Sequence, residues 1–342
     1  MSKTLSKLEL EKYDSKNMHQ LYDKWPTIAK DSFNTSFEPI DYKNINHIVF
    51  SGMGGSGSIG TVFESILSKT NLHVSVVKGY LLPKTVDKNT LVVTTSVSGN
   101  TVETLEILKI AKKLSCKVVG LSSGGKIEKF CNSHNIEFRK IPQFHSPRAS
   151  FPSFLYSMLN IFEPMIPIKK KEIKDSLKNL EKIGNKIASH NLSETNPSLE
   201  LANWITGIPL IYYPFGLQSA AIRFKNSLQE NAKIHAMTED VLEMSHNGIV
   251  SWEKSSIFKP ILLQGKDDYF KTKERWRIIK QFFQDNNIGY FELKSINGHI
   301  LSKLSSLIYL LDYSSIYYAL KTKTDPSPVK SIEYVKNKLN KR

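Results

Sequence analysis

Short apolar runs that alternate with amphipathic segments constrain the fold of this chain most. The runs at 47–52, 90–96 and 117–123 each end in glycine or small polar residues, and helical patterns follow at about 58–68 and 102–114. Two further runs, at 72–77 and 136–142, fit the same scheme. Parallel strands need crossover connections, which are usually helices, so this alternation predicts a parallel sheet with helices on both faces.

The alternation returns in the second half of the chain. Apolar runs at 208–216, 259–265 and 289–294 alternate with helical patterns at about 218–230, 272–284 and 302–320, and a last helix is expected at 330–339. A lysine- and asparagine-rich helical segment, roughly 170–189, joins the halves. We therefore predict an α/β chain with an N-terminal helical arm (1–45), a first domain (46–168), a helical linker (169–195) and a second domain (196–342).

The composition narrows the class of partner. The net charge is +15, but the lysines are dispersed, and neither a zinc finger nor a basic region with heptads is visible, so we expect no nucleic-acid partner. The apolar runs are too short to span a bilayer, and the first residues lack the apolar core of a secretory signal. With only two cysteines, we expect a cytoplasmic protein without disulfides or a membrane partner, whose positive charge attracts small anions.

A glycine loop follows the first expected strand. The segment 52–57, GMGGSG, has the G-x-G-x-x-G spacing of dinucleotide sites, in which Gly54 and Gly55 allow close approach of a ligand. Such sites also need an acidic residue about 20 positions later, and 65–86 contains neither Asp nor Glu. Lys78 keeps an NADP site open as an alternative, but we expect no cofactor.

A second loop, rich in hydroxyl groups, follows the expected strand at 90–96. It places Ser96, Ser98, Asn100 and Thr101 around Gly99, at the start of a helix. Hydroxyls and backbone N–H groups there form a neutral cup for one phosphate, which a dinucleotide site does not need at this point. The alternative is simple capping of the helix by Ser98 and Thr101. Because several such residues stand together, we favour the phosphate site.

In this order, the two loops resemble the sugar isomerase (SIS) domain, a five-stranded parallel sheet between helices. The resemblance implies that Ser96, Ser98 and Thr101 bind the phosphate of a sugar phosphate, with Ser56 of the glycine loop beside them. It also implies two SIS-type domains, each with about five strands.

Further motifs are similar to the bifunctional phosphoglucose/phosphomannose isomerases. They are "PR" at Pro147–Arg148, "ENAK" at Glu230–Lys233, "HN" at His246–Asn247 with Trp252 soon after, and the Asp-Pro-x-Pro-Val signature at 325–329 before the last helix. By this resemblance Glu230 is the base, His246 opens the sugar ring, and Arg148 stabilises the enediolate. Lys336 is the best match for a lysine that assists ring opening, with Lys330 and Lys338 as the alternatives on that helix.

The resemblance implies a metal-free aldose–ketose isomerase that interconverts glucose 6-phosphate and mannose 6-phosphate with fructose 6-phosphate. It also implies a homodimer in which His246 acts in the partner's site. The alternatives are an SIS isomerase of another sugar phosphate and a non-catalytic SIS protein that senses one. Two departures from the family pattern bear on specificity: Gly248 replaces an acidic residue, and Phe151–Pro152 replaces small residues after Arg148.

Overall fold

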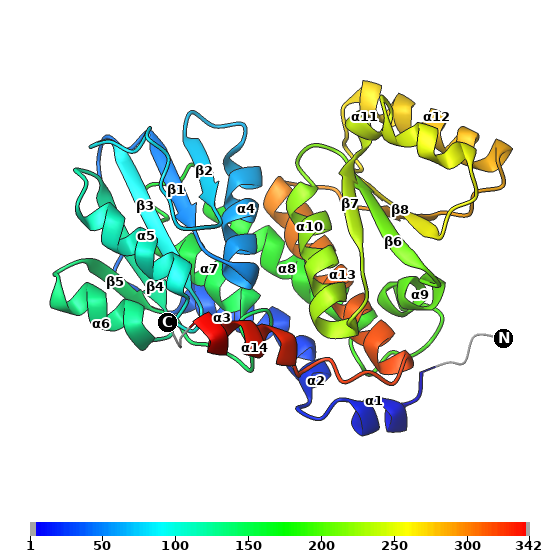
Figure 1. Cartoon of the computed structure of the whole chain (residues 1–342), viewed down its shortest axis with the longest axis horizontal. Helices are drawn as coiled ribbons and strands as arrows, with labels where there is room; N and C mark the ends of the chain where they lie inside the picture. Colours follow the sequence, from blue (N-terminus) through cyan, green and yellow to red (C-terminus); the bar gives the residue numbers. More distant parts are fainter. Residues whose placement is uncertain (1–4, 340–342) are drawn as a thin grey trace.

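The computed structural model describes residues 5–339 and contains two parallel sheets (Figure 1). The first sheet has five strands in the order β2-β1-β3-β4-β5. Its strands are β1 (His47–Ser51), β2 (His73–Val77), β3 (Thr90–Ser96), β4 (Lys117–Ser122) and β5 (Glu137–Lys140). The helices that connect and cover them are α4 (Gly54–Leu67), α5 (Val102–Lys112), α6 (Gly125–Ser133) and α7 (Phe151–Ile161). The predicted first domain is therefore an α/β sheet of the expected kind.

The two central strands explain why this sheet forms. Every residue of β1 and β3 is buried, and β1 pairs in parallel with both β2 and β3. A strand buried on both faces needs a continuous apolar sequence rather than an alternating one, and the runs at 47–51 and 90–96 meet that need. Because β1 and β3 are neighbouring parallel strands, the glycine loop and the serine-threonine loop that follow them lie side by side at one edge of the sheet.

The second sheet has four parallel strands in the order β7-β6-β8-β9. Its strands are β6 (Ile208–Tyr213), β7 (Met237–Asp240), β8 (Phe258–Gln264) and β9 (Phe291–Lys294), and α10 (Gln218–Ser227), α11 (Val241–Met244) and α12 (Phe270–Asp285) are the helices between them. About five strands were expected. The chain leaves β9 directly into a long buried helix, α13 (Ile300–Lys321), so no fifth strand is added within the described part of the chain.

Helix α13 joins the two halves into one hydrophobic core. It packs against α8 (Lys170–Ile187), α9 (Pro197–Trp204) and α10, and almost all of its residues are buried. The N-terminal arm forms α1 (Lys7–Tyr13), α2 (Met18–Asp23) and α3 (Trp25–Asn34), and Trp25 stacks on Tyr22 and Tyr309 there. A single apolar cluster thus runs from the arm through both sheets, and it fixes how the two halves face each other.

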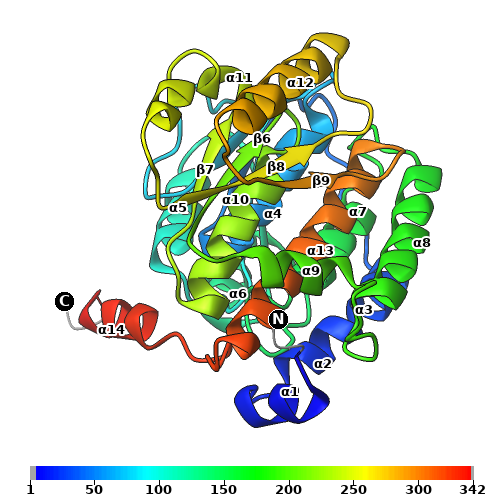
Figure 2. The same cartoon turned by 90° about the vertical axis from the view of Figure 1, so that its right-hand side faces the viewer.

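The C-terminal helix α14 (Lys330–Leu339) differs from the others because none of its described side chains is buried. In Figure 1 it lies below the first domain, in the lower middle of the view, and in Figure 2 it projects from the rest of the molecule. Between residues 5 and 339, no helix is both long and apolar enough to cross a bilayer.

Candidate active site

A cleft lies between the two halves, and the ENAK segment forms one of its walls. Its volume is about 820 Å³, within the range of small-ligand sites. Gly54 of the glycine loop lines it from the first domain, and Glu230 and Lys233 line it from the second. Residues 328–332, which end the signature and begin α14, line it as well. The cleft thus brings together three of the motifs that the sequence analysis singled out.

Glu230 lies in an unusual turn. Helix α10 was expected to continue to about residue 230, but it ends at Ser227, and Leu228–Ala232 form a π-helical turn. Lys233 then ends the helix in the left-handed conformation, with φ 59°. Next to Glu230, the fully buried Asn231 donates from its side-chain amide to Ser315 Oγ at 2.8 Å. Single π-helical turns are rare and occur frequently at functional sites, and this one holds Glu230 at the cleft wall.

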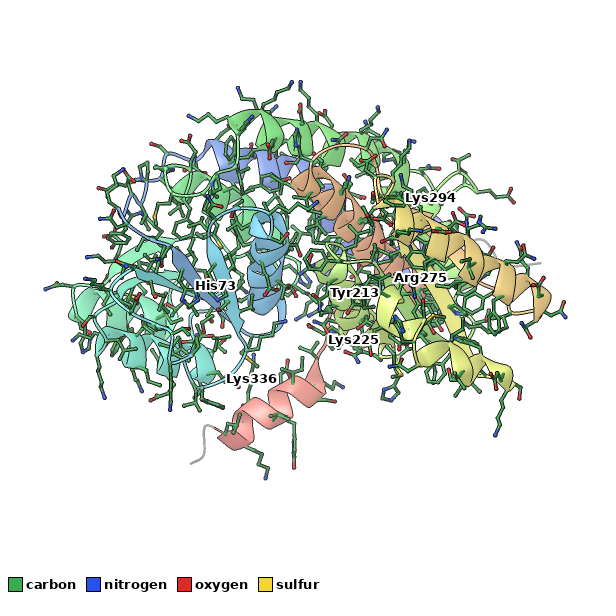
Figure 3. The ribbon with its side chains drawn as sticks, turned by 90° about the horizontal axis from the view of Figure 1, so that it is seen from above. His73, Tyr213, Lys225, Arg275, Lys294 and Lys336 are labelled. Atoms are coloured by element: carbon green, nitrogen blue, oxygen red, sulfur yellow. The ribbon has the colours of Figure 1, made fainter. Side chains whose placement is uncertain are left out.

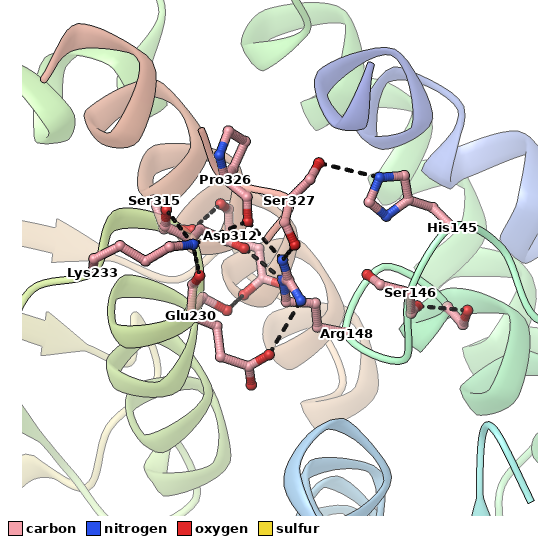
Figure 4. Close-up of polar contacts among 12 residues, drawn as sticks. His145, Ser146, Arg148, Glu230, Lys233, Asp312, Ser315, Pro326 and Ser327 are labelled. Atoms are coloured by element: carbon pink, nitrogen blue, oxygen red, sulfur yellow. Dashed lines mark hydrogen bonds and ion pairs between the residues drawn. The ribbon is translucent and has the colours of Figure 1, made fainter. Parts of the chain in front are cut away.

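Arg148 connects the π-helical turn to the Asp-Pro-x-Pro-Val segment (Figure 4). Its guanidinium donates to Glu230 Oε2 at 3.3 Å, to Asn231 Oδ1 at 2.6 Å, and to the carbonyl oxygens of Pro326 and Ser327 at 2.6 and 3.1 Å. The Arg148 side chain is only 5% exposed, whereas that of Glu230 is 25% exposed and reaches the cleft. The Asp-Pro-x-Pro-Val signature therefore supplies backbone acceptors that hold the arginine, and the arginine holds one oxygen of the glutamate.

A second buried ion pair supports Arg148 from behind. Arg223 of α10 binds Asp312 of α13 through Nε and Nη2, at 3.0 and 2.6 Å, and Nη2 also donates to the carbonyl oxygen of Arg148 at 2.8 Å. Phe151 lies under the Arg223 guanidinium, which is 4.1 Å from the ring centroid. Phe151 and Pro152 are both buried, so this departure from the family pattern belongs to the support of the site. Neither residue lines the cleft.

Lys233 adds a second positive charge beside Glu230, and the sequence analysis assigned it no role. Its Nζ donates to the backbone carbonyls of Glu230 and Pro326. Burial, and next the positive charge of Arg148, lower the pKa of Lys233 to about 8. The ENAK motif, which ends at Lys233, is the one feature of the sequence that indicates a part for this lysine in the site.

The serine-threonine loop forms a hydroxyl cluster at the carboxyl ends of β1 and β3. Ser56 Oγ accepts a hydrogen bond from the Val97 N–H at 3.1 Å, which joins the glycine loop to the second loop. Ser96 Oγ and Thr101 Oγ1 are 2.9 Å apart. Thr101 is the N-cap residue of α5, but its side chain does not cap the helix. The capping alternative therefore does not describe Thr101, and the helix N-terminus keeps N–H groups for an anion.

Two glycines permit this arrangement. Gly99 has φ 69°, and a Cβ there would lie 1.7 Å from the carbonyl oxygen of Gly124, so only glycine fits. Gly55 lies against the backbone of Pro147, with 3.2 Å from an added Cβ to the Pro147 carbonyl oxygen. The glycine loop therefore packs directly on the segment that carries Arg148. Ser98 is half-buried beside Gly99, and its Oγ accepts from the Asn100 N–H at 3.4 Å.

His246 and Lys336 do not meet Glu230 within the chain. His246 is exposed and follows α11, whereas α14 borders the cleft. In both views α11 lies at the top of the molecule and α14 lies low, far from it (Figures 1 and 2). Lys336 is exposed on α14 (Figure 3), and of the lysines on that helix Lys330 lines the cleft. Between residues 5 and 339, no group of three or more His, Cys, Asp or Glu side chains is placed to hold a metal ion.

The space beside Gly248 is filled by a carboxylate from another strand. A Cβ added to Gly248 would lie 2.5 Å from Oε1 of Glu239, so the carboxylate of β7 occupies that space. Burial and then the nearby charge of Glu243 raise the pKa of Glu239. A carboxylate therefore lies beside the His246 loop, although it comes from another position in the chain.

Comparisons with known proteins agree with this geometry. Residues 41–159 match the model of the SIS domain, and residues 194–339 match that of the bacterial phospho-glucose isomerase C-terminal SIS domain. A bifunctional phosphoglucose/phosphomannose isomerase of Caldicellulosiruptor bescii is 32% identical over 87% of this chain and 90% of its own length. The chain belongs to the family of bifunctional phosphoglucose/phosphomannose isomerases. A second such protein, from Aquifex aeolicus, is 32% identical over 93% of this chain and 94% of its own length.

A solved structure supports the family fold. The crystal structure of a hypothetical protein from Thermus thermophilus superposes with a TM-score of 0.75 at 14% identity, over 98% of this chain and 92% of the other. The arrangement of two SIS domains expected from the sequence is confirmed. The exact domain boundaries and the role of each site residue stay predictions.

Proposed function

We propose that this phosphoglucose/phosphomannose isomerase family member interconverts glucose 6-phosphate and mannose 6-phosphate with fructose 6-phosphate through an enediolate, without a metal ion. The observation that carries the proposal is the position of Glu230: it lies at the wall of a cleft between the domains, with one carboxylate oxygen on the Arg148 guanidinium. Aldose–ketose interconversion needs such a carboxylate to move a proton between C1 and C2.

The substrate would extend from the cleft wall at Glu230 past Gly54 to the serine-threonine loop, whose hydroxyl residues do not themselves line the cleft. Its phosphate would lie on Ser56, Ser96, Ser98 and Thr101, where the uncapped N-terminus of α5 favours an anion. Its C1–C2 end would then face Glu230. Glu230 Oε2 is bound by Arg148, while Oε1 has no hydrogen bond among the described residues and can take the proton.

The two positive charges near Glu230 suit the developing enediolate. Four of the five N–H groups of Arg148 are used in its contacts with Glu230, Asn231, Pro326 and Ser327, which leaves one N–H on Nη1 for the substrate. Lys233 lines the cleft beside Glu230, and its Nζ donates to the backbone carbonyl of Glu230. Fixed charges aimed at an oxyanion in a partly enclosed site stabilise the transition state more than they would in water.

The assembly that we propose is a homodimer in which His246 reaches the partner's cleft. Its support is the separation, within one chain, of α11 from α14, the helix that borders the cleft, because a ring-opening group must lie beside the substrate. Lys336, with Lys330 as the alternative, would assist ring opening from α14.

A coupled assay tests the function. Purified protein should convert fructose 6-phosphate to both aldose 6-phosphates, and EDTA should leave the rate unchanged. Activity on neither epimer would reject the proposal in favour of another sugar phosphate or a binding protein, and a loss on EDTA that zinc restores would reject the metal-free mechanism.

A further inference from the structure

A second cavity lies between the second domain and the end of α4, and it shares no lining residue with the first cleft. Its volume is about 390 Å³. It opens beyond the carboxyl ends of β6 and β8, lined by the loops 214–217 and 265–269, the first turn of α13 and the end of α4. Because β7 and β8 lie on opposite sides of β6, this is the point at which the strand order reverses. Open α/β sheets bind ligands at such switch points.

Helix N-termini converge on this cavity. Helices α10, α12 and α13 begin at its edge, with Leu217, Tyr269 and His299 as their N-cap residues. None of these three side chains makes a capping hydrogen bond. Each helix therefore presents uncapped N–H groups and the positive end of its dipole, and both favour an anion.

Two buried donors without partners stand next in the chain to residues of the cavity wall, but neither side chain lines the cavity. Ser302, in the first turn of α13, is 1% exposed, and its hydroxyl has no hydrogen-bond partner among the described residues. Gln264, which directly precedes Gly265 of the cavity wall, is 6% exposed, and its Nε2 has no such partner either. Native proteins satisfy nearly all buried polar groups, so these two unpaired donors are exceptions beside the lining residues Gly265 and Lys303.

The charged and aromatic groups at the cavity define the class of ligand. Lys303 lines it, held by Asp267 at 2.9 Å, and Lys69 lines it from the first domain. Two carboxylates, those of Asp267 and Asp268, line it as well. Phe215 and Tyr269 are 74% and 67% exposed at its edge. Lysines suit a phosphate, carboxylates such as Asp267 accept hydrogen bonds from hydroxyl groups, and an aromatic face packs on the C–H face of a sugar ring.

We propose that this cavity is a second binding site, separate from the isomerase cleft, and that it takes a phosphorylated sugar. The phosphate lies at the N-termini of α10 and α13 with Lys303 and Lys69, and the sugar ring lies against Tyr269 and Phe215. The site is the second domain's counterpart of the serine-threonine loop, with lysines in place of hydroxyl groups. The inference does not depend on turnover in the first cleft.

Equilibrium binding of labelled fructose 6-phosphate tests the site. The protein is used in its native assembly and carries Glu230→Gln, which prevents turnover. We expect about two molecules per chain, about one after Ser98→Ala with Thr101→Ala, and about one after Lys69→Ala with Lys303→Ala. The matched control is Lys271→Ala, which removes a lysine that pairs with Glu274 on α12 and does not line the cavity, and it should keep both sites.

Two further measurements distinguish a lost site from a misfolded protein, and a sugar phosphate site from one that binds phosphate alone. Tyr269→Ala changes an exposed side chain and should weaken the second site about fivefold. Inorganic phosphate should compete at that site, but more weakly than the sugar phosphate. The proposal is overturned if binding stops at one molecule that Ser98→Ala with Thr101→Ala removes, if the second molecule is insensitive to both the lysine and the Tyr269 substitutions, or if inorganic phosphate competes as well as fructose 6-phosphate.

Discussion

The buried pair of Arg223 and Asp312 offers a quantitative test of what supports Arg148 at the site. The Asp312 side chain is fully buried; Oδ2 accepts two hydrogen bonds from Arg223, and Oδ1 accepts one from Ser227 at 2.7 Å. Asp312→Asn keeps the shape but leaves the arginine charge buried without its partner. Removing one member of such a pair costs about 3–5 kcal/mol of the free energy of unfolding. Whole domains have only about 5–15 kcal/mol, so the loss is large.

Urea unfolding followed by circular dichroism measures this loss. The matched control is Glu274→Gln, which breaks the exposed pair with Lys271 and should leave the unfolding midpoint unchanged. Replacing both charges, Arg223→Met with Asp312→Leu, should recover most of the lost stability, because no charge is then left unpaired. Activity should stay low in that double variant, since the Arg148 carbonyl loses its contact with Arg223. An Asp312→Asn protein within about 1 kcal/mol of the parent would refute this reasoning.

Three further results follow from the site. Ser98→Ala with Thr101→Ala should raise the KM for fructose 6-phosphate strongly while leaving the circular dichroism spectrum intact; an unchanged KM would reject the phosphate loop. Because the pKa of Lys233 is lowered to about 8, its charge is lost as the pH rises through that value, so kcat/KM should fall above about pH 8, and Lys233→Arg should move this fall to higher pH; coincident profiles would contradict its role. Mixing Glu230→Gln chains with His246→Ala chains should restore part of the activity, since one site of the mixed dimer is intact; no recovery despite proven subunit exchange would mean that each chain builds its own site.

Much of the fold could be predicted from the sequence because local patterns carry it. The strands at 47–51 and 90–96 are built on the apolar stretches 48–50 and 91–93, each followed by small polar residues, and the last helix occupies the expected residues 330–339. Strand β7 (Met237–Asp240) was missed, because its residues are half-buried or exposed and include Glu239 and Asp240. Pairing with the buried strand β6 makes it a strand, and the sequence pattern does not show that contact.

The candidate site was less accessible to sequence reasoning, because its parts meet through long-range contacts. The expected helix at 218–230 becomes a π-helical turn from Leu228, held by the contacts of Asn231 with Arg148 and Ser315. The acceptors for Arg148 at Pro326 and Ser327 are backbone carbonyls, which no residue type marks. The carboxylate of Glu239 beside Gly248 is likewise visible only once β7 is placed.

The kinetics of Glu230→Gln test the central claim most directly. Glutamine keeps the size of the side chain and can still accept from Arg148, but it cannot take the proton from C1 or C2. Both aldose 6-phosphates should be measured with the same preparation, against the parent protein. If Glu230 is the single base, kcat falls by at least about two orders of magnitude for both epimers, with KM little changed. Retained activity on mannose 6-phosphate with loss on glucose 6-phosphate, or retention of both, would contradict the assignment.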